Sequence, residues 1–140
     1  MKCLLIGGIV IVVGLVVAAA ASISGDRSIM VPPPDARAEA FVRELATHRY
    51  KLARRYVAAD MRRHISAEML QQAFGRVTAQ IGTVQDVQAQ LLWSDRSHAL
   101  ARAEVRGTSG VRLPLQFGLV WEHGRWAINE LPSLLQVPGR

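Results

Sequence analysis

The chain has 140 residues, half of them hydrophobic, and carries a net charge of +6. This length allows one domain with its own core, and the single cysteine excludes an intrachain disulfide. The basic charge favours anionic partners, but the aromatic residues lie at apolar positions rather than among the basic ones, so no nucleic-acid partner is expected.

The first segment of the chain is strongly apolar. Residues 3–23 contain no charged side chain, and as a helix they are about 31 Å long, close to the thickness of the bilayer's hydrocarbon core. They are therefore predicted to form a transmembrane anchor or an uncleaved signal segment. The run of alanines also fits a signal peptide cleaved near Ala21, which leaves a secreted or periplasmic protein.

The charges beside this segment predict its orientation. Lys2 and the amino terminus precede it, whereas Asp26 and Arg27 nearly cancel just after it. By the positive-inside rule, the N-terminus is expected in the cytoplasm and the domain on the other side of the cell membrane, in a single-pass arrangement.

A polar stretch with three prolines separates the apolar segment from the rest. Residues 24–35 contain Pro32, Pro33 and Pro34, which predict an extended polyproline II spacer. Asp35 is a candidate N-cap for a first helix. The domain itself is therefore predicted over residues 36–140.

The helical period predicts three helices after the linker. The first has Phe41, Val42 and Leu45 on one face, and the second begins near Tyr50. Ser66 is the predicted cap of the third, which ends at Gly82. If the second helix is continuous, four basic residues share its polar face: Lys51, Arg54, Arg55 and Arg62.

The period then changes from 3.6 to 2. Alternating apolar residues predict four strands over residues 87–93, 99–105, 111–121 and 126–129. Pro114 in the longest strand predicts a bulge or an edge-facing position. The expected fold is α+β, with three N-terminal helices packed on a curved, cone-like, four-stranded antiparallel sheet, and the transmembrane helix before it.

The last predicted hairpin carries a resemblance. Residues 119–128 read Leu-Val-Trp-Glu-His-Gly-Arg-Trp-Ala-Ile, and together with the order of helices and strands they resemble the nuclear-transport-factor-two-like (cystatin-like) superfamily over roughly residues 36–131. This resemblance implies a small, membrane-anchored bacterial envelope protein. Members with one span, a spacer and one such domain include bridge components of secretion and conjugation machines and accessory proteins of lipid-transport systems.

Asp60 is the one candidate for acid–base chemistry. In a continuous second helix it falls on the apolar side, near Tyr56, and the resemblance implies a general base there, because some isomerases and cyclases of this fold place an acid at that point. Alternatively, the helix breaks at Asp60, and the carboxylate caps the following turn or pairs with Arg63 or His64. The chain shows no metal-ligand spacing, so neither a metal nor a cofactor is expected.

Tyr56, Trp93 and Trp121 are candidates for lining a ligand pocket in the open end of the cone. Tryptophans at such inward positions are otherwise part of the core. On the opposite face of the sheet, Leu92, Leu100 and Val120 form a contact patch if they lie together.

The basic face predicts contact with anionic lipid headgroups or an acidic partner surface, unless it is an ordinary solvated helix face. The expected function is therefore a non-enzymatic interaction or accessory module of a cell-envelope membrane complex, with the bilayer and a protein as partners. The alternatives are a small-molecule or lipid-binding carrier that uses the apolar cone, and an isomerase- or cyclase-like enzyme that uses Asp60.

Overall fold

The computed structural model describes residues 31–136 of the chain. The predicted membrane span and the alternative cleavage site near Ala21 both lie outside the described residues. Within residues 31–136, no helix is both long and apolar enough to cross a membrane. From Pro32 onward, the described chain forms one compact unit.

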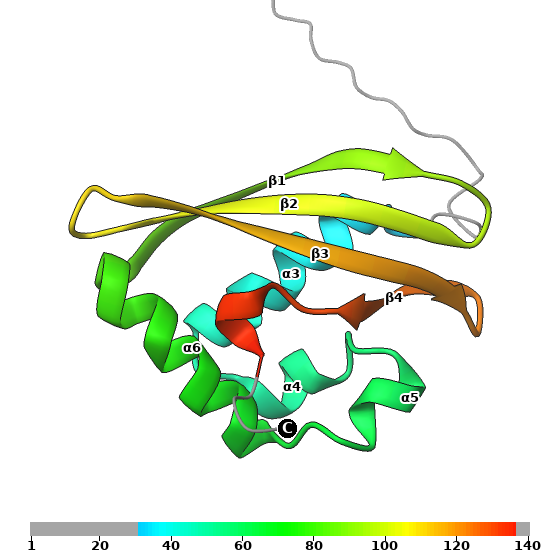
Figure 1. Ribbon diagram of the computed structural model, residues 1–140, viewed down its shortest axis with the longest axis horizontal. Coiled ribbons are helices and arrows are strands. Elements are labelled where there is room, and N and C mark those ends of the chain that lie inside the picture. The colour runs from blue at the N-terminus through cyan, green and yellow to red at the C-terminus, as the bar shows by residue number, and fades with distance from the viewer. Residues whose placement is uncertain (1–30, 137–140) are drawn as a thin grey trace, which may run out of the picture. The chain divides into compact units, whose positions relative to one another are not determined.

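Helices come first and strands follow. The elements are α3 (Pro34–Ala46), α4 (Tyr50–Arg54), α5 (Ala59–Arg62), α6 (Ala67–Ile81), β1 (Val84–Ser94), β2 (His98–Gly107), β3 (Arg112–Glu122), β4 (Arg125–Glu130) and the 3₁₀ helix η4 (Ser133–Leu135). The strands form one antiparallel sheet in the order β1-β2-β3-β4, which curves over the helices (Figure 1). The predicted α+β fold with four antiparallel strands is confirmed.

The ends of α6 follow the local sequence signals, whereas the start of α3 does not. Ser66 caps α6 as predicted, since its Oγ accepts from the Met69 N–H at 3.1 Å, and Gly82 ends the helix with φ 81°. α3, however, begins at Pro34, with Pro33 as its N-cap. Asp35 therefore lies inside the first turn, where its charge favours the helix dipole, and the prediction that it is the cap is wrong.

The predicted second helix is not continuous. α4 ends at Arg54 and α5 begins at Ala59. Between them, the Tyr56 carbonyl accepts from the Ile128 N–H at 2.8 Å, and the Ala58 N–H donates to the Ile128 carbonyl at 2.7 Å. These backbone groups bond to β4 instead of to the next helical turn, so the helix breaks.

The interior beneath the sheet is filled with side chains. Phe41 of α3 and Phe117 of β3 are fully buried, with ring centroids 5.7 Å apart. Leu131 and Leu135, which follow β4, are buried as well, and Arg76 of α6 holds that segment by donating to the Leu134 carbonyl at 3.1 Å. Within the described residues, the space between the curved sheet and the helices, which was expected to be an open cone, is a packed core.

A bulge in β1 reverses the predicted direction of Trp93. Leu91 pairs with the buried Ala101, whereas Trp93 pairs with Leu100, so Leu92 is an extra residue in the strand. Leu100 lies on the face away from the helices, and its partner Trp93 is 50% exposed there. The predicted inward position of Trp93 is wrong, because one inserted residue exchanges the two faces of the strand beyond it.

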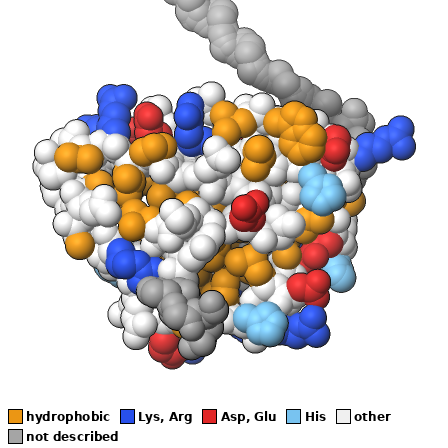
Figure 2. Space-filling model, in the orientation of Figure 1, with side chains coloured by type: hydrophobic (Ala, Val, Ile, Leu, Met, Phe, Trp, Pro, Cys, Tyr) orange, Lys and Arg blue, Asp and Glu red, His pale blue; other side chains and the backbone are white. Residues whose placement is uncertain are grey.

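The outer face of the sheet is apolar at one end and charged at the other. Leu100 pairs with Gly118, and Val120 follows two residues along β3, so the predicted outer patch does come together with Leu92 and Trp93. In Figure 2, basic and acidic side chains lie together along the upper left edge, and large apolar side chains lie at the upper right beside charged ones. The charged end holds the ion pairs Asp86–Arg106, at 4.0 Å, and Glu104–Arg112, at 3.8 Å.

Asp95 holds the turn between β1 and β2. Its Oδ1 accepts from the N–H groups of Ser97, at 2.9 Å, and His98, at 2.8 Å. These bonds favour the charged carboxylate and so lower the pKa of Asp95 below its usual value.

The Asp95 carboxylate therefore stabilises the folded turn at pH values above about 3.9, the pKa of an aspartate in the unfolded chain. This stabilisation is lost as the pH falls through the lower pKa that Asp95 has in the folded protein. We expect the amides of Ser97 and His98 to lose protection from hydrogen exchange below about pH 4. The Asp95→Ala variant should show the same loss already at neutral pH. Unchanged protection factors in that variant would contradict this role.

Candidate functional site

Basic residues gather around one open groove beside the start of α6. The groove has a volume of about 640 Å³ and is lined by α4, by residues 63–66 and by the first turn of α6. Four cations and one acid line it: Lys51, Arg54, Arg55, Arg63 and Glu68. We call this surface the basic groove.

The beginning of α6 adds to the positive potential of the basic groove. The first N–H groups of a helix have no partner inside it, and the helix dipole places partial positive charge there. Ser66 satisfies one of these groups, at Met69, while Ala67 and Glu68 line the groove itself. His64 also lines it and is exposed. The groove is therefore suited to carboxylate or phosphate groups.

The structure brings together three of the four predicted basic-face residues. Arg54 is fixed by two carbonyls, since its Nε donates to Ile65 at 2.6 Å and its Nη2 to Arg62 at 2.8 Å. Lys51 and Arg55 are exposed on the rim. Arg62 lines a neighbouring hollow instead and donates to the Val57 carbonyl at 3.2 Å, because the break in the helix turns it away from the other three.

Asp60 does not point into the interior. Its side chain is 94% exposed, and its Oδ1 lies 2.7 Å from Nη2 of Arg63. The alternative in which the helix breaks and Asp60 pairs with Arg63 is the one found. The inward placement is wrong, because the Tyr56 carbonyl and the Ala58 N–H bond to β4 and shift α5 out of the helical phase of α4. Asp60 therefore does not have the inward position that a general base in the cone requires.

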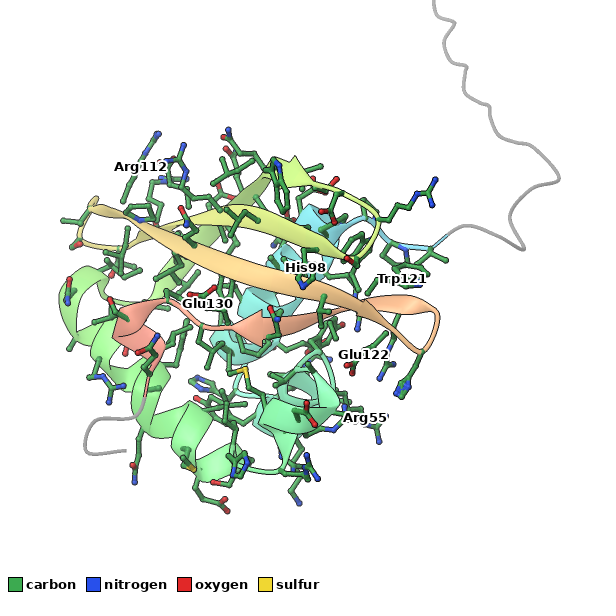
Figure 3. All side chains as sticks on the ribbon, turned by 45° about the vertical axis from the view of Figure 1, so that its right-hand side comes forward. Arg55, His98, Arg112, Trp121, Glu122 and Glu130 are labelled. Atoms are coloured by element: carbon green, nitrogen blue, oxygen red, sulfur yellow. The ribbon has the colours of Figure 1, made fainter. Side chains whose placement is uncertain are left out.

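The candidate pocket residues Tyr56, Trp93 and Trp121 do not surround one cavity. Tyr56 is half-buried under Arg37, whose Cζ lies 4.3 Å from the centroid of the ring. The Nε of Arg37 donates to the Trp126 carbonyl at 3.0 Å, and Trp126 meets Trp121 edge to face, with centroids 5.4 Å apart. Trp93 lies on the other face of the sheet. Figure 3 shows Trp121 at the end of the sheet opposite Arg112.

Arg37 is a half-buried cation that sequence reasoning missed. Burial lowers the pKa of its guanidinium, Tyr56 acts in the opposite direction, and the cation of Arg125 lowers it again. The group remains charged at neutral pH. Its partner Trp126 is distant in sequence, so no local pattern identifies the contact. Arg63 and His64, which were expected only as partners of Asp60, also line the basic groove. They directly follow the predicted basic face, and this proximity was the available signal.

Among the described residues, no three or more His, Cys, Asp or Glu side chains lie together in a way that could hold a metal ion.

Helical segments followed by a four-stranded antiparallel meander define the nuclear-transport-factor-two-like (NTF2-like) fold, and the domain has this fold. A Campylobacter jejuni protein, provisionally described as an NTF2-like transpeptidase, has a similar structure, with a TM-score of 0.53 and 16% identity over 66% of this chain and 93% of that chain. At this identity the likeness shows the fold alone. No protein-family model matches the sequence, and no curated protein matches it.

Proposed function

We propose that the chain is a non-enzymatic interaction module of a cell-envelope membrane complex, in which the basic groove binds an acidic segment of a partner protein. The observation that carries this proposal is the gathering of four Lys and Arg side chains, with a single Glu, around one groove. The NTF2-like fold is compatible with both binding and enzymatic roles, so the fold does not choose between them.

The basic groove is partly organised before a partner binds. Two carbonyl hydrogen bonds already hold Arg54 in place, so less side-chain freedom is lost when an anion meets it. Lys51 and Arg55 are exposed and supply the longer-range attraction that speeds association with an acidic surface. The carrier and isomerase alternatives lack comparable support, since the interior is packed and Asp60 faces solvent.

A charge-reversal experiment tests the groove. The probe is a fluorescently labelled glutamate-rich peptide, and its binding to the full-length protein is followed by anisotropy at several salt concentrations. We expect the variant Lys51→Glu/Arg55→Glu to bind about ten-fold more weakly or worse, because each reversal turns an attraction into a repulsion.

The matched control is Arg102→Glu/Arg112→Glu, which makes the same change in net charge at exposed positions of β2 and β3. Its affinity should change by less than about three-fold. An equal loss in the two variants would show that net charge alone attracts the peptide, and the basic groove would then have no special role.

The membrane-complex part of the proposal has its own test. Full-length protein, extracted gently from its own membrane, should carry a stoichiometric second polypeptide in native mass spectrometry, with residues 1–23 still attached. That polypeptide should be missing from Lys51→Glu/Arg55→Glu and present in the control variant. A lone chain that carries a small-molecule or lipid mass would instead support the carrier alternative.

A further inference from the structure

Large apolar side chains are exposed at one end of the sheet. Leu91 is 42% exposed, Leu92 39%, Trp93 50% and Trp121 40%. All four lie beside the β1–β2 turn or the β3–β4 turn, and the Trp121 N–H donates to the Ser97 carbonyl at 2.9 Å, which holds β3 against the first of these turns. We call this surface, with residues 95–97 and 123–125, the hairpin end.

Two cations lie beside these apolar side chains, since Arg96 and Arg125 are exposed in or beside the two turns. Two acids lie there as well: Asp95, which accepts from the N–H groups of its own turn, and the neighbouring Glu122, whose Oε2 accepts from the Ala59 N–H at 2.9 Å. Exposed tryptophans beside arginine side chains are typical of surfaces that sit at the headgroup level of a bilayer.

The chain also enters the domain at this end. In the first turn of α3, Arg37 contacts the Trp126 carbonyl beside the β3–β4 turn, whereas Arg43, near the end of α3, donates to Val87 at the other end of the sheet. Residues 24–33 join the predicted membrane span to α3. The described part of the chain therefore begins at the hairpin end of the sheet.

We infer that the hairpin end is a membrane-contact surface, in which Trp93 and Trp121 enter the interface of an anionic bilayer. This contact orients the domain with the charged end of the sheet away from the membrane. The basic groove lies on the helix side, where Figure 3 shows Arg55, and stays open to a protein partner. The inference does not depend on what the basic groove binds.

Tryptophan fluorescence in brominated lipid tests this contact. The full-length protein is reconstituted into vesicles of phosphatidylcholine and phosphatidylglycerol, with or without bromine on the acyl chains near the headgroups. Bromine quenches tryptophans that enter the interface. We expect the natural protein to be quenched at least about two-fold more than Trp93→Phe/Trp121→Phe, which keeps only the half-buried Trp126.

A control places a tryptophan at the opposite end of the sheet. Val111 is 49% exposed beside the β2–β3 turn, and Val111→Trp in the double variant should leave the quenching low. Equal quenching of the natural protein and the double variant, or strong quenching of the new tryptophan, would overturn the inference. The single variant Trp93→Phe should lose part of the quenching. Circular dichroism shows whether this variant is folded, so it still tests the inference if the double variant misfolds.

Discussion

Replacing Phe117 by alanine is expected to lower the free energy of unfolding by about 3–5 kcal/mol. The ring is fully buried and meets the ring of Phe41 at an interplanar angle of 81°. Its removal leaves a cavity that the curved sheet and α3 cannot close by small shifts, so both the transfer energy and the packing energy are lost. Urea unfolding of the full-length protein in detergent, followed by tryptophan fluorescence, measures the loss.

The control for Phe117 is Val111→Ala, at an exposed position of the same chain, which should change the free energy of unfolding by less than about 0.5 kcal/mol. The comparison also bears on function. A loss below about 1 kcal/mol at Phe117 would indicate a loosely filled cone, and the carrier hypothesis would then regain support.

The variant Gly107→Ala is expected to destabilise the domain by about 3 kcal/mol. Gly107 ends β2, where the last turn of α6 crosses it, and a Cβ there would lie 2.7 Å from the carbonyl carbon of Ile81. Because the obstacle is backbone and not the end of a flexible side chain, either α6 or the β2–β3 turn has to move. Urea unfolding measures this effect, and hydrogen exchange at Ser109, which donates to the Ile81 carbonyl at 3.1 Å, locates it.

Gly75 provides a glycine control with the opposite sign. It lies within α6, and an added Cβ meets nothing within 4 Å. Alanine is a better helix former than glycine, so Gly75→Ala should raise the free energy of unfolding by about 0.5–1 kcal/mol. If both glycine variants shift stability in the same direction, close packing at Gly107 is not the cause of its effect.

The main elements of the fold were predictable because each depends on a local period. α6 carries its own cap, its apolar spacing and its closing glycine, and the strands of the meander alternate cleanly over most of their length. The packed face of each element follows from that spacing, which is why four antiparallel strands and their helical cover could be foreseen. The hydrogen bonds of Tyr56 and Ala58 to Ile128 connect distant parts of the chain, and no local pattern indicates them.

The candidate site was only partly predictable for the same reason. The basic residues were visible as a run along the sequence, but the break between α4 and α5 decided which of them share a groove. It brought Arg63 and His64 to Lys51 and Arg55, and it turned Arg62 away. No residue type at these positions reveals the break, since the residues of the linking segment also fit a helix.

The sequence by itself determined the order of helices and strands, the apolar faces of most of them and the basic character of the helical region. It also contains the apolar segment from which the membrane anchor is predicted. Only the tertiary structure decided that Asp60 faces solvent and that Trp93 leaves the inner face. Spacing along the chain controls which side chains share a face, whereas hydrogen bonds between distant segments and single inserted residues control where that face points.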